Sequence, residues 1–88
     1  MMNHLEIANR TGVSFADLDE LLKGRATANV ASRLGVTMGD VEAFIDGKAD
    51  LAMTQRLGLQ TMSAAMELGA AAGQAGAIGI IMGLLLSN

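Results

Sequence analysis

The sequence predicts an all-α fold in which two tandem helix-turn-helix-like units of short helices are followed by a long apolar C-terminal helix. Two observations support it. Residues 7–26 are repeated as residues 30–49, with seven of the 20 positions identical. Within each unit, apolar residues recur at the three- and four-residue spacing of a helix. A fixed period indicates one supersecondary unit used repeatedly, each unit burying its apolar side against the next, as is typical of assembly and binding proteins.

The first unit contains start and stop signals for two helices. Asn3, with Glu6 three residues later, is typical of an N-cap and its reciprocal partner. Gly12 ends the first helix, because glycine adopts the left-handed conformation at low cost. Ser14 caps a second helix and Asp17 follows at its third position, where a carboxylate favours the positive end of the helix dipole. Three leucines give the second helix one apolar face: Leu18, Leu21 and Leu22.

The second unit repeats these signals. Thr27 can cap its first helix, Gly35 can end that helix, and Thr37 with Asp40 can open the next. The residues that match the three leucines are Val41, Phe44 and Ile45. Each unit closes on a glycine, which is Gly24 in the first and Gly47 in the second. Four short helices are therefore predicted between residues 3 and 47.

A third repetition begins after Asp50, which can cap a further helix. Residues 56–58 repeat residues 33–35, but Gln60 replaces the capping serine or threonine. We therefore expect no stop at Gly58 and one longer helix from about residue 51 to about residue 72. The apolar content of residues 70–86 predicts further helix. The chain is thus divided into residues 1–49, the two units, and residues 50–88, an apolar helical arm.

Charge is confined to residues 1–67, and the segment from Leu68 to Leu86 carries none. This segment is just long enough to span a bilayer as a helix, and glycines four residues apart let helices pack closely. A chain of this size has little core for so much apolar surface, so we expect copies of the chain, lipid or a different protein to cover it. The expected contact residues are Gly69, Gly73, Gly76, Gly79, Gly83, Ile80 and Leu84.

Composition argues against catalysis. The chain has no Cys, so neither a disulfide framework nor a thiolate metal site can form. Its one histidine, His4, is expected on the surface of the first helix, and no glycine-rich run precedes Lys-Ser or Lys-Thr. Capping and solvation account for the carboxylates. We therefore expect no enzyme activity, metal, cofactor or small-molecule substrate. The N-terminus lacks the pattern of a cleaved secretory signal.

The segment Ala31-x-x-Leu34-Gly35-Val36-Thr37, followed by Val41 and Phe44, resembles the helix-turn-helix of bacterial repressors. The first unit fits the same pattern, and the resemblance covers residues 4–49. It implies DNA binding through the second helix of a unit, in the major groove.

The residues on these second helices argue against nucleic acid as a partner. Asp17, Asp19 and Glu20 lie on the first, and Asp40 and Glu42 on the second, so each would be repelled by phosphates. The net charge of −3 acts in the same direction. Three basic residues do recur with the period and could contact an anionic partner or form salt bridges with neighbouring acids: Arg10, Arg33 and Arg56.

These observations predict a non-enzymatic, self-assembling structural or interaction protein. It would form homo-oligomers through its Gly/Ala-rich C-terminal helix, as a component of a tube, ring, filament or virion. Two alternatives stay open: a small tail-anchored membrane protein with a partner-binding helical module, and a helix-turn-helix DNA-binding regulator. The sequence does not distinguish a cytoplasmic location from a membrane or an assembled particle.

Overall fold

Seven α-helices and no strand make up the described part of the computed structural model, residues 3–48 and 51–87. The prediction of an all-α fold is confirmed. The helices are α1 (His4–Thr11), α2 (Phe15–Leu22), α3 (Ala28–Leu34), α4 (Met38–Ile45), α5 (Leu51–Leu57), α6 (Leu59–Ala71) and α7 (Gly76–Ser87).

The first four helices begin at the predicted caps. The side chains of Asn3, Ser14, Thr27 and Thr37 each accept a hydrogen bond from the backbone N–H three residues later. At α4 the capping box is complete, because the carboxylate of Asp40 accepts from the backbone N–H of Thr37 at 3.2 Å. Four short helices between residues 3 and 47 are therefore confirmed. The expected cap at Asp50 lies outside the described residues.

The repeat in sequence is also a repeat in backbone conformation. Gly12 and Gly35 end α1 and α3 in the left-handed region, with φ of 74° and 72°. Gly24 and Gly47 follow the ends of α2 and α4 with φ of 83° and 77°. The same 2.9 Å hydrogen bond then closes both of these ends: Arg25 N–H to Glu20 C=O, and Lys48 N–H to Ala43 C=O. Each unit thus turns in the same way.

The expectation of one helix from residue 51 to residue 72 is wrong. Gly58 has φ of 75° and ψ of 149°, which ends α5 at Leu57 and starts α6 at Leu59. Only glycine adopts this conformation without a steric cost. No side chain caps α6, because its N-cap is Gly58, and Gln60, which matches the capping residues of the earlier units, is already inside the helix. The third unit therefore keeps the glycine in register with Gly12 and Gly35, and loses only the two-residue spacer between its helices.

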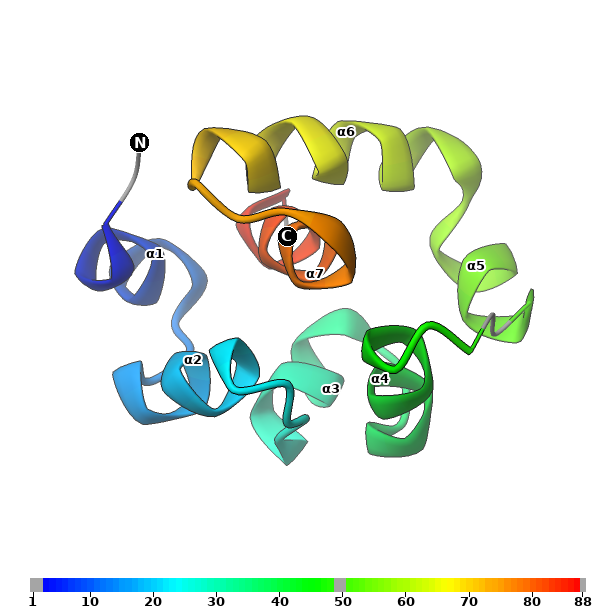
Figure 1. Ribbon diagram of the computed structural model, residues 1–88, viewed down its shortest axis with the longest axis horizontal. Coiled ribbons are helices and arrows are strands. Elements are labelled where there is room, and N and C mark those ends of the chain that lie inside the picture. The colour runs from blue at the N-terminus through cyan, green and yellow to red at the C-terminus, as the bar shows by residue number, and fades with distance from the viewer. Residues whose placement is uncertain (1–2, 49–50, 88) are drawn as a thin grey trace.

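The C-terminal region is a hairpin and not a single long helix. The chain turns by 102° between α6 and α7, and α7 lies at the centre of the molecule with the other helices around it (Figure 1). It contacts α1, α3, α4 and α6. Four of its side chains are at most 2% exposed: Ile81, Met82, Leu84 and Leu85. Its own chain thus covers most of α7, while Ile78 and Ile80 are only half-buried, and cover of this segment by lipid or another chain stays a prediction.

Equivalent positions of the three units contribute to the same core as the buried residues of α7. Ile7, Val30 and Met53 occupy matching positions of the repeat in α1, α3 and α5, and each is fully buried. On the second helices, Leu18 and Val41 are likewise buried. The repeated apolar pattern therefore becomes a repeated contact with one core.

Glycines set the close approach of α6 to α7. A Cβ added at Gly83 would overlap the carbonyl of Ala65 and lie 2.6 Å from its Cα. A Cβ at Gly69 would overlap the carbonyl of Gly79 and lie 2.8 Å from its Cα. These small residues therefore permit backbone-to-backbone packing within one chain.

We predict that Gly83→Ala destabilises the fold by about 1–3 kcal/mol or more, because the added methyl group meets backbone that cannot rotate away. Gly39→Ala is the matched control in α4, where the nearest atom to an added Cβ is Thr37 Oγ1 at 3.8 Å. This variant should be neutral or gain up to about 1 kcal/mol from helix propensity. Urea unfolding followed by circular dichroism measures both, and equal midpoints for the two variants would contradict the packing described.

Candidate interaction surface on the C-terminal hairpin

One row of exposed side chains runs along the outside of α6. Leu59, Ser63, Met66 and Ala70 fall within about 60° of the helix circumference, at about 100° per residue, and all four are exposed. Leu59 is 78% exposed and Met66 is 56% exposed. We name this row the α6 stripe. The fully buried residues of the helix are instead small, Ala65 and Gly69, and Met62 and Leu68 are half-buried.

A groove of about 240 Å³ continues the stripe onto the start of α7. Its lining residues are Met66, Ala70, Gln74, Ala75, Gly76, Gly79 and Ile80. Because most of them are alanine or glycine, the backbone turn between α6 and α7 is left hollow, and the longer side chains of Met66 and Ile80 contribute to its walls. Gln74 is the one lining residue whose side chain is polar, and none is charged. We name this hollow the apolar groove.

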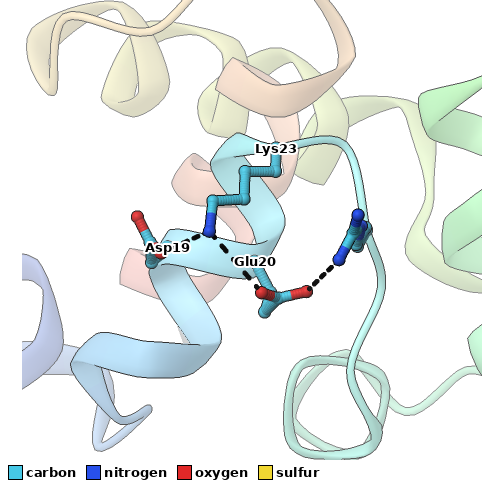
Figure 2. A network of polar contacts seen from close by, with 4 residues as sticks. Asp19, Glu20 and Lys23 are labelled. Atoms are coloured by element: carbon cyan, nitrogen blue, oxygen red, sulfur yellow. Dashed lines mark hydrogen bonds and ion pairs between the residues drawn. The ribbon is translucent and has the colours of Figure 1, made fainter.

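Ion pairs lie on other helices. On α2, the ammonium of Lys23 lies 3.0 Å from Asp19 and 3.9 Å from Glu20, while Arg25 lies 3.4 Å from Glu20 (Figure 2). Such exposed pairs contribute little to stability, about 0–1 kcal/mol each. The carboxylates beside Lys23 and Arg25 lower the positive potential around both cations.

The periodic arginines lie on the first helices of the units. Arg56 of α5 contacts Asp40 of α4, with 3.1 Å between Nη1 and Oδ2. The ion-pair interpretation therefore holds for Arg56. The guanidinium of Arg33 lies against Gly12, since a Cβ added there would be 3.2 Å from Arg33 Cζ. Arg10 is exposed in the last turn of α1. Contact of these arginines with an anionic partner stays a prediction.

Equivalent aspartates join each unit to the next. In the first unit, Asp17 Oδ2 accepts hydrogen bonds from Ser14 Oγ and from Asn29 Nδ2 of α3, both at 2.8 Å. In the second, Asp40 holds Arg56 of α5. The hydrogen bonds from Asn29 and Ser14 lower the pKa of Asp17 below its ordinary 3.8, against the raising effect of partial burial. The charged form of this carboxylate is therefore the one that stabilises the junction.

The other residues expected to make contacts are divided by the structure. Gly69, Gly79, Gly83 and Leu84 are buried within the chain, whereas Gly73 and Gly76 are exposed near the hairpin turn. Ile80 is half-buried in the groove wall.

The ring of His4 lies at a tilt beside that of Phe15, with 6.2 Å between ring centres. In the described ranges, no group of three or more histidines or carboxylates is placed to hold a metal ion.

Leu59, Ser63, Met66 and Ala70 were not predicted as a site. The sequence does contain a pattern that indicates this row, because the apolar residues Leu59 and Met66 are seven residues apart and therefore share a helix face. The contact residues were predicted from the uncharged segment, which begins only at Leu68 and so leaves out Leu59, Ser63 and Met66.

No single helix within residues 3–48 and 51–87 is long and apolar enough to cross a membrane. Helices α6 and α7 meet that criterion only when taken together across their 102° bend. The described residues thus form a small all-α protein with a repeated helical unit and an exposed apolar surface on α6. No known protein family, curated protein or solved structure matches the chain.

We predict that the junction at Asp17 makes stability depend on pH. Because its pKa is lowered in the folded state, its contribution is present above the ordinary pKa and is lost as pH falls through the lowered value. Asn29→Ala removes the largest cause of that shift and should flatten the loss of stability below about pH 4. The control Asn9→Ala, at an exposed position on α1, should keep the full dependence. Urea unfolding at a series of pH values is the measurement, and parallel curves for the two variants would refute the assignment.

Proposed function

We propose that this chain is a non-enzymatic interaction protein that assembles with copies of itself through the α6 stripe and the apolar groove. The observation that carries the proposal is the exposure of Leu59 and Met66 in one uncharged row beside an apolar hollow. Single exposed apolar residues are common, but a continuous row beside a groove is typical of a binding surface. Covering each of these side chains stabilises a complex by about 1.5–3 kcal/mol before the costs of association.

The contact helix in this proposal differs from the one expected from sequence. Helix α7 is buried in the core of its own chain, so the glycines Gly69, Gly79 and Gly83 support the hairpin. The outer side of α6 supplies the surface for another chain, together with Ile80 from α7.

A second copy suits this surface because the stripe carries no charge. The chain has a net charge of −3, so two copies repel one another at long range. Inside the stripe, however, no like charges are brought together, and Glu67, the one charged residue of α6, lies beside the row. The flexible thioether of Met66 can adjust to the partner surface. The acidic second helices would stay outside as the polar exterior of the assembly.

A second exposed apolar area supports assembly beyond a pair. Leu5 on α1 is 62% exposed and Phe15 at the start of α2 is 53% exposed. These residues lie on helices other than α6, so a chain with both surfaces could extend into a ring, tube, filament or virion component.

We predict that Ala70→Lys lowers the oligomeric state, because a buried ammonium at the groove would lack a partner. Ala64→Lys is the matched control, since Ala64 is also an exposed alanine of α6 but lies about 120° away from Ala70 around the helix. Sedimentation velocity in detergent-free buffer, at concentrations up to about millimolar, measures the mass. Circular dichroism confirms that each variant is folded. A wild-type chain that is monomeric throughout, or equal loss in both variants, would sink the proposal.

The second candidate function is membrane association, favoured by the combined length and hydropathy of α6 and α7. It has less support, because withdrawing α7 into lipid would remove its buried residues from the core that they share with Ile7 and Val30. DNA binding is supported only by the resemblance of residues 4–49, against the acidic charge of α2 and α4.

We predict that the protein does not float with neutral phosphatidylcholine vesicles in a density gradient, since its most apolar helix is enclosed by its own chain. The matched control is Gly83→Ala, in which the hairpin contact is weakened. Release of α7 should make this variant associate with vesicles more than the wild type does. Complete flotation of the folded wild-type protein would instead promote the membrane function above self-assembly.

A further inference from the structure

Large and small side chains alternate along the α6 stripe. Reading from the start of the helix, the order is Leu59, Ser63, Met66 and Ala70, which is large, small, large, small. The midpoint between Leu59 and Ala70 is also the midpoint between Ser63 and Met66. A twofold axis through that point, perpendicular to the helix, therefore places every large residue of one copy opposite a small residue of the other.

From this pattern and the groove we infer that the protein forms a twofold dimer in which the α6 helices of two copies pair antiparallel. Leu59 of each copy then faces Ala70 of its partner and enters the apolar groove, which Ala70 lines. Ser63 faces Met66 in the same register. The contact is isologous, so one surface serves both copies. This inference rests on the proposed self-assembly and specifies the partner of the same site.

The groove and Leu59, the more exposed of the two large residues of the stripe, lie toward opposite ends of α6. Leu59 is the first residue of the helix and is 78% exposed, while the groove is formed at its last turn and at the start of α7. Antiparallel pairing fills both grooves at once. Parallel pairing would place Leu59 against Leu59 and Ala70 against Ala70, with crowding at one end and an empty space at the other. It would also align the two helix dipoles unfavourably.

The repeat explains why this side of α6 is open. The period of the repeat places Ser63 at the position of Asp17 and Asp40, whose carboxylates hold the first helix of the following unit. No further unit follows α6, which is succeeded by the core helix α7. The second copy thus docks where the next unit would have been, on a stripe that has lost the carboxylate and gained apolar side chains.

The dimer should be weak and reversible. One pair of such short helices is a small contact, and interfaces below about 1,200 Å² are typical of transient complexes. Leu59→Ala should raise the dissociation constant at least about tenfold, because the symmetry removes two anchors at once. Met38→Ala, which changes an exposed apolar residue of α4 outside the stripe, should leave it unchanged.

Cysteine cross-linking tests the register directly, because the natural chain contains no Cys. Single variants Leu59→Cys and Ala70→Cys are mixed, one of them isotopically labelled, and oxidised in a glutathione buffer. Opposed positions in paired helices bring Cα atoms within the range of about 4.4–6.8 Å that a disulfide requires. The expected product is the mixed 59–70 disulfide, identified by mass spectrometry, in clear excess over the disulfides of either variant with itself. Met38→Cys, at an exposed position of α4, mixed with Ala70→Cys is the control for random collision.

The outcomes separate the register from self-assembly. If Leu59→Cys links mainly to itself, pairing is parallel and the inferred dimer is wrong, although self-assembly stands. If the mixed disulfide forms no faster than the Met38 control while sedimentation shows a dimer, the register is also overturned. A wild-type protein that sediments as a monomer at every concentration would overturn both the register and the proposed function.

Discussion

Burial of α7 is the constraint on which the rest of the structure depends. This helix has apolar or glycine residues on every side over most of its length, so it must be enclosed from all directions. Helices α1, α3, α4 and α6 contact it, and the equivalent residues Ile7, Val30 and Met53 belong to the same core. A pair of short helices cannot bury its own apolar side. The shell and the central helix therefore each supply the surface that the other lacks.

The way α6 meets α7 determines what remains exposed. Contact through Ala65, Gly69, Gly79 and Gly83 brings backbones together and uses the smallest residues of α6 on its inner side. The larger apolar residues Leu59 and Met66, together with Ala70, are thereby directed outward. An ordinary surface helix has its large apolar residues inside and polar ones outside. Reversal of that order is understandable if the outer side is covered by another chain.

The ends of the short helices could be predicted from the sequence, whereas the position of α7 and the exposed side of α6 could not. Side-chain caps such as Ser14 and Thr37 and the left-handed glycines act over three or four residues, so their patterns predicted α1 to α4. At Gly58 two patterns disagree. The lack of a capping side chain at Gln60 predicts a continuous helix, whereas the glycine period of the repeat predicts the break that the structure has. The position of α7 could not be predicted, since a helix that is apolar on every side has no periodicity to indicate its neighbours. The α6 stripe was missed for a related reason, because Leu59 and Met66 lie before the uncharged segment.

The end of the repeat links fold to proposed function. A repeat array exposes at its last unit the surface that earlier units use for their successors, and natural arrays usually cover it with a polar cap. Here Asp17 and Asp40 show what that surface does inside the array, where a carboxylate holds the next unit by polar contacts. At Ser63 the carboxylate is absent, and the flanking residues Leu59 and Met66 are apolar and exposed. A polar residue at this position would be solvated. In the proposed assembly, the apolar side chains of the last unit are covered by a second copy of the chain.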